Sequence, residues 1–460
     1  MTQNAPESAG NIVKFQISSN FTDYAVELSA GVVDFRYYEN VLTNSVTATA
    51  TCVETGYQAD DKGGAAGQQS TVDGLPIRGG ERTDITIEDA YGNELTFEEG
   101  LYVNRLRDVD AGTSKDVYFI DFASREFFAN EQTRVVKRYE GNIGDNVEKI
   151  LKDVLKVTTD IEIDNTAVPY NFIGNDRKPF YICTWLASKS IPEVTTEDGK
   201  SGKGGAAGYL FFQTRDGYHF RSIDKIFTGE PKKKFIFNNS TQLPEGYDAK
   251  VLTYDINSDI DVGKNLMMGM YNNRSIFFDP LAFNYEVRSF PKAEVPQVEG
   301  DIVVDEIPTE DEYLEKTQNA AEEPVGKLIP DEFRQSPTRF MSFITDNGVM
   351  PSGIDSQEQL NTWSSEKAKD NFDVKETMSQ SIMRYSQLFT VKTEITIPGD
   401  FTIKAGDVIQ CDFPDLSGSE VKGVNTETKG IYMVASVCHR ITPTSSNTSL
   451  SLVRDSFGGK

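Results

Sequence analysis

Between residues 12 and 140, apolar and polar positions alternate in short runs separated by turns. "IVKFQISS", "VVDFRYYENVL", "SVTATATCVET" and "DVYFIDFAS" share this period of two and are rich in β-branched and aromatic residues. Side chains of a strand point alternately to the two faces of a sheet, so this pattern is typical of half-buried strands. We therefore expect an antiparallel β unit over residues 12–140.

Helical spacing replaces the alternation in four later segments. The first is "NIGDNVEKILKDVLK", in which Asp145 is placed to cap the helix. Residues 180–190, "FYICTWLASKS", suit a short helix or a buried element, and the segment "VGKNLMMGMYNN" predicts a brief helix. A longer helix is predicted at 364–387, with an apolar stripe that we interpret as core packing. The stripe consists of Val374, Met378, Ile382, Tyr385 and Phe389.

Alternation returns in the second half of the chain. "YLFFQTRDGYHFRS" predicts a hairpin that turns at Asp216 and Gly217. In "LFTVKTEITIPGDFTIKAGDVIQCDF", residues such as Ile395 and Ile397 fall on one face, and polar residues such as Glu394 fall on the other. The string "GGAAG" occurs at 63–67 and again at 204–208, which suggests two related β units with equivalent loops.

An acidic segment interrupts this second half. Between Glu294 and Glu323, eleven Asp and Glu residues stand against one basic residue, Lys316. A stretch of this composition buries little apolar surface. We expect residues 291–335 to form an extended or partly ordered connector.

The whole chain of 460 residues is strongly acidic, with 46 Lys and Arg against 71 Asp and Glu, a formal net charge of −25. Such a surface repels phosphate, which disfavours sequence-specific nucleic-acid binding. The first residues lack the features of a secretory signal, and no run reaches the roughly 20 apolar residues that span a bilayer. The four scattered cysteines fit reduced thiols. We expect about three domains, made in a cytosol and without membrane insertion.

Only two histidines, His219 and His439, are available for histidine chemistry. Cys438 and His439 are adjacent on a predicted strand, so their side chains should point to opposite faces rather than form a nucleophilic couple. Cys411 would approach His439 only if their strands paired. We interpret His439 as a structural residue that closes a barrel rim by a hydrogen bond, and extend this interpretation to His219.

Two glycine-rich strings mimic phosphate-binding loops. "GKS" at Gly199 to Ser201 lacks the first glycine of such a loop, because Val194 occupies that position. "GKGGAAG" opens onto the predicted strand "YLFFQT", so no helix N-terminus would receive a phosphate. Neither string predicts a nucleotide site.

The segment "DGYHFRSID" combines Asp216, Arg221 and Asp224, a mixture that hydrolases use. In a hairpin these residues more simply form cross-strand ion pairs. No spacing of ligands predicts a metal site. We therefore expect no catalytic residues, no cofactor-binding residues and no metal ligands, and a protein that is not an enzyme.

The order of elements carries a family resemblance. The helix "KAKDNFDVKETMSQSIMRYSQ" leads into "FTVKTEITIPGDFTIKAGDVIQC", and "GIYMVASVCHRITPTSSNTSLSLVRDS" follows. This closing unit resembles that of hub proteins of contractile tails. Earlier segments, "DFRYYENVLTNSVTATATCVET" and "SREFFANEQTRVVKRYEGNIGDNVEKIL", are similar to the baseplate central hub of T4-like contractile-tailed phages, especially the cyanophage type. The resemblance covers roughly residues 24–290 and 364–456.

The resemblance implies a mainly β fold with α+β insertions: two tail-tube-like antiparallel β barrels plus peripheral α/β domains. We assign the first barrel to residues 12–140 and an α/β insertion to 141–208. The second barrel would be discontinuous, from 209–255 and 388–456. Residues 256–387 would form a peripheral helical or irregular region that includes the acidic connector.

The resemblance also implies a structural role. Three copies would form a homotrimeric, pseudo-sixfold ring that joins the threefold central spike to the sixfold tail tube and nucleates assembly. Implied partners are the spike, a tube initiator or tube protein, the tape-measure protein and, as further candidates, baseplate wedge proteins. The location would be the tail baseplate of the virion, assembled in the host cytoplasm. Alternatives are the hub of a related tailocin or secretion machine, and a tail-associated cell-wall hydrolase.

Overall fold

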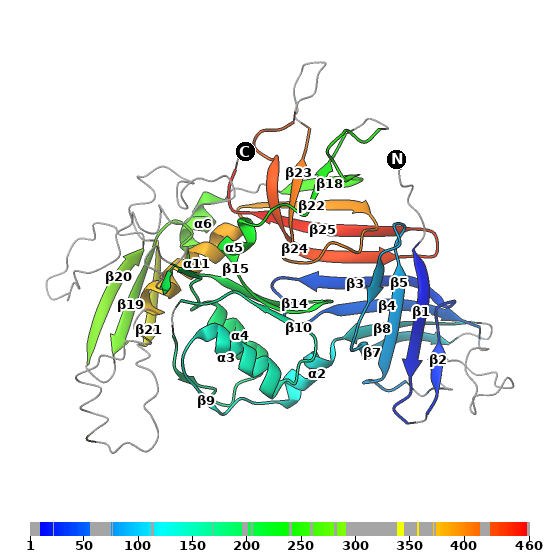
Figure 1. Cartoon of the computed structure of the whole chain (residues 1–460), viewed down its shortest axis with the longest axis horizontal. Coiled ribbons are helices and arrows are strands. Elements are labelled where there is room, and N and C mark those ends of the chain that lie inside the picture. Colours follow the sequence, from blue (N-terminus) through cyan, green and yellow to red (C-terminus); the bar gives the residue numbers. More distant parts are fainter. Residues whose placement is uncertain are drawn as a thin grey trace.

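The computed structural model is mainly β with helical insertions, which confirms the predicted fold class (Figure 1). It describes residues 10–21, 23–55, 75, 77–111, 115–167, 169–195, 201–203, 206–238, 242–257, 261–279, 283–290, 338–344, 357, 371, 374–414 and 424–457. The predicted connector at 291–335 and the first "GGAAG" copy lie outside these residues. Among the helices described, none is long and apolar enough to cross a membrane.

The first β unit forms one end of a 15-stranded sheet, in the spatial order β3-β4-β8-β7-β5-β1-β2, with β6 beside β5. Its strands are β1 (Asn11–Ser18), β2 (Ala25–Glu27), β3 (Val32–Asn40), β4 (Thr47–Glu54), β5 (Arg82–Glu88), β6 (Glu94–Thr96), β7 (Leu101–Ala111) and β8 (Asp116–Ala123). The alternating apolar positions converge on one core, in which Phe15 packs edge-on against Phe35 and Phe122. The predicted strand pattern of this region is confirmed.

The second β unit supplies the rest of the large sheet. Its strands are β16 (Lys233–Ile236), β17 (Ala249–Lys250), β18 (Thr253–Asn257), β22 (Val391–Pro398), β23 (Val408–Asp412), β24 (Gly430–Ile441) and β25 (Ser446–Arg454). On β22, Ile395 and Ile397 are buried while Glu394 is exposed, as the alternation predicted. A separate apolar core lies under these strands.

An α/β unit lies between the two in the sequence. It contains α2 (Arg125–Gln132), β9 (Arg138–Tyr139), α3 (Ile143–Lys149), the π-helical turn η1 (Ile150–Val154), β10 (Asp160–Ile163), β11 (Phe172–Ile173), α4 (Pro179–Ala187), β12 (Glu193–Thr195), β13 (Ser201–Lys203), β14 (Tyr209–Thr214), β15 (Gly217–Ser222) and α5 (Ile223–Phe227). β14 and β15 form the predicted hairpin, and β15 also pairs in parallel with β10. This three-stranded sheet is separate from the large one. The domain boundaries stay a prediction.

The predicted cap of the first helix is wrong. α3 begins at Ile143, with Asn142 in the N-cap position, so Asp145 lies inside the first turn. A carboxylate there still stabilises the helix through its dipole. The helical path then widens into η1, which keeps Ile150 and Leu151 buried in the core of the α/β unit.

The remaining described elements are α6 (Val262–Met268), β19 (Asn273–Asp279), β20 (Asn284–Phe290), β21 (Arg339–Ile344) and α11 (Val374–Leu388). α6 and α11 fulfil two of the helix predictions. Of the predicted stripe on α11, Met378, Tyr385 and Phe389 are partly buried and pack against two apolar cores, as the core-packing interpretation expects. α11 also buries polar residues, and the Arg384 guanidinium binds the carboxylates of Asp224 and Asp455. α11 is therefore enclosed on several sides.

Candidate functional site at the junction of the two β units

One long strand, β24, belongs to both β units. Its first residues pair with β23, with Met433 opposite Val408, and its last residues pair along the same edge with β3, with His439 opposite Tyr37. The change of partner follows a bulge at Ala435, whose carbonyl accepts a hydrogen bond from the N–H of Val41. Because strand pairing fixes direction and register, this shared strand sets the orientation of one unit against the other.

The loop between β22 and β23, residues 399–407, crosses this junction. It contains "GDFTIKAGD", part of the string on which the family resemblance depends. Gly399 packs so closely against β25 that an added Cβ would lie 2.1 Å from Ser446 Oγ, so only glycine fits without a shift. The next apolar residue, Phe401, is fully buried in the core of the first unit and lies edge-on to His439. The loop therefore inserts a side chain of the second unit into the core of the first.

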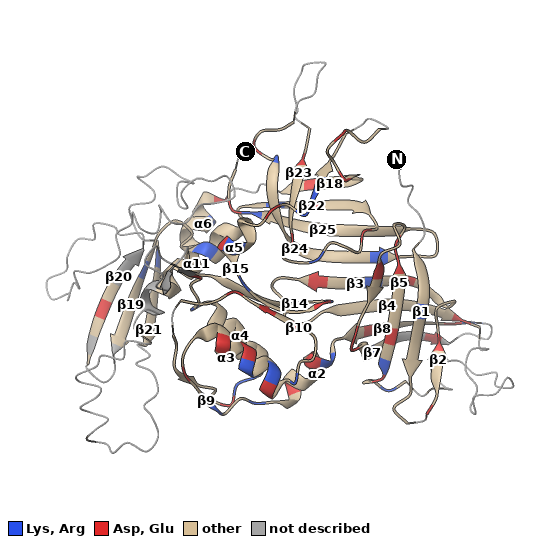
Figure 2. Ribbon diagram, viewed as in Figure 1, with Lys and Arg blue, Asp and Glu red and all other residues tan. Residues whose placement is uncertain are grey.

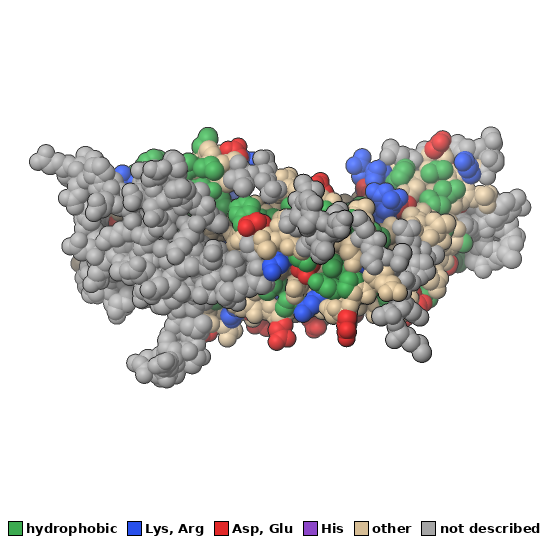
Figure 3. Space-filling model, turned by 90° about the horizontal axis from the view of Figure 1, so that it is seen from above, with side chains coloured by type: hydrophobic (Ala, Val, Ile, Leu, Met, Phe, Trp, Pro, Cys, Tyr) green, Lys and Arg blue, Asp and Glu red, His purple; other side chains and the backbone are tan. Residues whose placement is uncertain are grey.

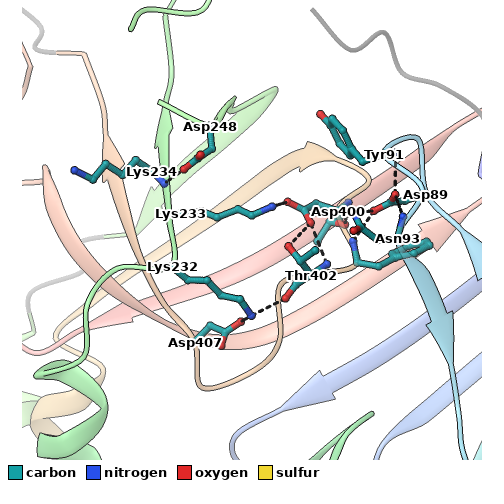
Figure 4. Close-up of polar contacts among 12 residues, drawn as sticks. Asp89, Tyr91, Asn93, Lys232, Lys233, Lys234, Asp248, Asp400, Thr402 and Asp407 are labelled. Atoms are coloured by element: carbon teal, nitrogen blue, oxygen red, sulfur yellow. Dashed lines mark hydrogen bonds and ion pairs between the residues drawn. The ribbon is translucent and has the colours of Figure 1, made fainter. Parts of the chain in front are cut away.

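Two consecutive lysines at the start of β16, Lys232 just before the strand and Lys233 in it, hold this loop, as Figure 4 shows. Lys233 binds the carboxylate of Asp400. Lys232 donates to Asp407 Oδ2 at 2.8 Å and to the carbonyl of Thr402 at 2.7 Å. The Lys234 side chain points away in the same view, although its backbone N–H binds Asp248. Two consecutive lysines thus bind the two aspartates of the "GD…GD" string.

The Asp400 carboxylate is charged in the folded protein. Burial opposes its ionisation, but hydrogen bonds from Lys233 and Thr402 outweigh that effect and lower its pKa. Its Oδ1 accepts the backbone N–H of Thr402 at 3.0 Å and the Thr402 hydroxyl at 2.6 Å. The loop conformation and the ion pair therefore depend on the same carboxylate.

The turn between β5 and β6 fastens the same loop from the first unit. Asp89 accepts the backbone N–H groups of Tyr91 and Asn93, both at 2.8 Å, which shapes its own turn (Figure 4). Its other oxygen accepts the N–H of Phe401 at 3.1 Å. Asp89 thus joins a turn of the first unit to the loop that carries Phe401.

Glu39 is the most buried carboxylate at the junction, with 1% of its surface exposed. It accepts hydrogen bonds from the Tyr37 hydroxyl at 2.9 Å, the Arg215 N–H at 2.9 Å and the Ala405 N–H at 2.8 Å. Burial raises the pKa of Glu39, and these donors oppose that rise. Arg215 belongs to the β14–β15 turn, so this side chain connects both β units with the α/β unit.

His439 is buried at the same junction. Its ring is stacked on that of Tyr37, with the ring centroids 6.2 Å apart. Its Nδ1 lies 2.9 Å from the Thr448 hydroxyl, whose oxygen also accepts the N–H of Asp400. Desolvation lowers its pKa to about 3, so the imidazole is neutral at pH 7. The predicted hydrogen bond of His439 is confirmed, and its role in closing a barrel rim stays a prediction.

The neighbouring cysteines do not complete a reactive couple with His439. Cys438 lies on the opposite, half-exposed face of β24, as the alternation predicted. Cys411 does sit on a strand that pairs with β24, but it lies opposite Gly430, far along the strand from His439. Burial raises the pKa of the Cys438 thiol and holds the Cys411 thiol far above its usual range.

His219, in the α/β unit, has both ring nitrogens bound within the chain. Nε2 lies 2.8 Å from the Thr214 hydroxyl and Nδ1 lies 2.8 Å from Glu162 Oε2. The ring stacks on Phe212 with centroids 5.0 Å apart. These contacts fasten β10 and β14 to β15.

The structure separates the three polar residues that suggested a hydrolase. Arg221 pairs with Glu162 of the neighbouring strand β10, at 3.3 Å, as expected for a cross-strand pair. Asp216 instead binds Lys404 of the 399–407 loop, and Asp224 binds Arg384 of α11 at 2.9 Å. The prediction of cross-strand pairs is therefore right for Arg221 and wrong for the two aspartates.

The structure also describes parts of the two glycine-rich segments that mimic phosphate-binding loops. Ser201 opens strand β13, paired with β12, so a strand and not a helix follows "GKS". Ala206 and Ala207 of the second "GGAAG" copy are buried. Within the described ranges, no group of three or more His, Cys, Asp and Glu residues is arranged to hold a metal ion.

One junction residue, Glu39, could have been identified from the sequence. Phe35, Tyr37 and Glu39 fall on one face of β3, so the alternation already placed a carboxylate among buried aromatic rings. Asp89, Lys232 and Lys233 gave no such signal, because their partners lie more than a hundred residues away along the chain.

Comparisons with known proteins find similarity of fold. No protein-family model matches the sequence, and no curated protein matches it significantly. The tail protein from Neisseria meningitidis MC58 is similar at 10% identity with a TM-score of 0.49, over 96% of both chains. The 43 kDa tail protein of prophage MuSo2 from Shewanella oneidensis is similar at 8% identity and a TM-score of 0.49, over 96% of this chain and 98% of that one. A type VI secretion component from E. coli is similar at 8% identity and a TM-score of 0.40, over 97% of this chain and 79% of that one.

Proposed function

We propose that this chain is a structural baseplate hub of a contractile phage tail, of the T4-like type, and that it acts as a homotrimer without catalysis. The observation that carries the proposal is the sharing of β24 between the two β units. The order of the sequence segments that resemble hub proteins supports it independently.

A ring of six similar units built from three chains requires that the two units of each chain keep one fixed orientation. The shared strand supplies such a connection in the backbone. The 399–407 loop supplies a second one, through Phe401 in the first core and the ion pairs to Lys232 and Lys233. Two independent connections resist bending between the units better than one flexible linker would.

Open sheet edges are available for contacts between subunits. The path of strands in the large sheet ends at β17 and at β2, and β18 pairs only with β22 among the described strands. An edge strand carries unpaired N–H and C=O groups that bind a strand of another chain. In the proposed trimer these edges meet neighbouring subunits, while the spike, tube initiator, tape-measure protein and wedge proteins bind elsewhere on the ring.

The acidic excess suits a channel through which DNA passes, since negative walls repel phosphate and prevent sticking. On the face seen in Figure 3, the described acidic, basic and hydrophobic side chains lie interspersed. The excess of carboxylates is therefore not gathered on the described part of that face. The proposal expects it on the surface that faces the ring axis.

The decisive experiment is to measure the mass and shape of the assembly. Light scattering of the purified chain, alone and with a spike protein of the same phage, should give three chains. Averaged electron micrographs should then show an annulus with an axial hole. A stable monomer or an even-numbered ring in the presence of the spike contradicts the hub. Peptidoglycan turnover that disappears in a His439→Ala variant would contradict the absence of catalysis.

A further inference from the structure

The α/β unit has a groove beside the free edge of strand β10. The groove encloses about 340 Å³ and is lined by the first turns of α3, by Ile161 and Ile163 of β10, and by Glu193 of β12. β10 is the outermost strand of its sheet, because it pairs with β15 on one side only among the described strands. Just after β10, the Glu193 N–H donates to the Asn165 carbonyl at 3.0 Å, so the open part of this edge is the stretch at Ile161 and Ile163.

The backbone of β10 directs hydrogen-bonding groups into this groove. The N–H of Asp164 donates to Phe220 of β15 at 2.9 Å, so this residue faces the paired side. Backbone groups of a strand alternate in direction, which turns the N–H and C=O groups of Ile161 and Ile163 toward the open side. No backbone partner for these two residues exists within the described part of the chain.

The groove is also negatively charged. Asp145 and Glu148 of α3 and Glu193 of β12 line it, and Figure 2 shows acidic positions along α3. Glu148 binds Lys152 at 2.6 Å. Glu193 lies opposite Lys203 in the β12–β13 pair. Among the side chains that the structure describes, none forms an ion pair with Asp145. A ligand with spaced positive charges would therefore match the groove.

We propose that this groove binds an extended basic segment of another protein, which adds to β10 as an extra strand. Backbone hydrogen bonds to Ile161 and Ile163 would supply affinity, and lysine or arginine side chains meeting Asp145 and Glu193 would supply selectivity. The acidic lining of the groove favours a basic occupant, and a second copy of this chain is the alternative that the test below distinguishes. The inference goes beyond the hub role and does not depend on it.

The test uses the full chain and a labelled peptide of alternating lysine and valine, followed by fluorescence anisotropy. We expect saturable binding of the peptide. The affinity should fall about two- to fivefold in the Asp145→Asn variant, and by a similar factor in the Glu193→Gln variant. Asp153→Asn is the matched control, because Asp153 lies on η1 outside the groove. It should bind the peptide as the original chain does.

Two further comparisons separate strand addition from simple attraction between charges. Ile161→Pro removes the N–H that faces the groove, whereas Ile161→Ala removes the same side-chain packing but keeps the N–H. We expect the proline variant to bind the peptide at least tenfold more weakly than the alanine variant. A peptide N-methylated at alternate residues should bind at least tenfold more weakly than the unmodified one.

Several results would overturn the inference. These are the absence of saturable binding, equal binding of the methylated peptide, and equal affinity of the proline and alanine variants. Concentration-dependent dimerisation that Ile161→Pro abolishes would instead assign the edge to a second copy. None of these results bears on the trimeric ring, which light scattering tests separately.

Discussion

The carboxylate of Glu39 on β3 accepts the backbone N–H of Ala405 at 2.8 Å, although the two residues are 366 positions apart. Glu39 belongs to the first β unit and Ala405 to the loop of the second. Nearby, Lys404 of the same loop binds Asp216 of the α/β unit. The 399–407 loop therefore contacts all three units. Substitutions at the residues that hold this loop should weaken the contacts between the units.

The ion pair between Lys233 and Asp400 should stabilise the junction measurably. Asp400 is nearly buried, so Lys233→Met leaves its charge with the Thr402 hydrogen bonds but without a cation, and should lower the free energy of unfolding by about 2–4 kcal/mol. Lys234→Met is the matched control, since the Lys234 side chain is exposed, and should change it by less than about 0.5 kcal/mol. Urea unfolding followed by circular dichroism measures both. Equal losses would mean that the pair does not hold the loop.

Phe401 should contribute to stability through the core of the other unit. Phe401→Ala removes a fully buried ring and should lower the free energy of unfolding by about 3–5 kcal/mol, while Phe401→Leu should cost about 1–2 kcal/mol. Phe283→Ala, at a side chain 85% exposed, serves as the control. Limited proteolysis should also cut the Phe401→Ala variant faster near the junction. Unchanged cleavage in that variant would show that the loop is not a connection between the units.

Gly217 should tolerate no side chain. Its φ is +152°, and an added Cβ would lie 1.9 Å from the carbonyl oxygen of Asp160 on the paired strand β10. Gly217→Ala should therefore separate β10 from β15 and lower the free energy of unfolding by about 3 kcal/mol or more. Gly263→Ala in helix α6 meets only an ordinary contact and should be neutral or slightly stabilising. Thermal unfolding of the two variants gives the comparison, and a neutral Gly217→Ala would contradict the close approach.

The sequence patterns predicted those features that depend on residues close together along the chain. The alternation on β22 and the split of Cys438 from His439 follow from the period of a strand, and both are confirmed. The cap of α3 was placed three residues late, because Asn142 and Asp145 are both good N-cap residues and local sequence does not choose between them.

The features that the sequence did not predict depend on contacts between residues that are far apart along the chain. The hairpin 209–222 reads as another piece of β barrel, yet it joins β10, a strand about fifty residues earlier. Similarly, the contact of Lys233 with Asp400 spans 167 positions. The apolar stripe on α11 does pack against the cores, but it did not predict that the helix also buries polar residues with distant partners, such as Arg384 with Asp455. Amphipathic spacing assumes one buried face.

The buried imidazole of His439 should make stability depend on pH in mild acid. Its pKa is lowered to about 3 in the folded chain, whereas an unfolded histidine titrates near 6.5. Between these values the unfolded chain binds a proton that the folded chain does not, so acid favours unfolding. The stabilising contribution is complete above pH 6.5 and falls by about 1.4 kcal/mol for each pH unit below it.

A His439→Asn variant isolates this effect, because asparagine does not titrate and its amide oxygen can still accept a hydrogen bond from Thr448. The free energies of unfolding of the two proteins should be compared by urea titration at pH 7.5 and at pH 4. Their difference should shift by about 3 kcal/mol between the two pH values, in favour of the variant at pH 4. The carboxylates are the same in both proteins, so their titration cancels in this comparison. A constant difference would show that His439 keeps an ordinary pKa and is reached by water in the folded junction.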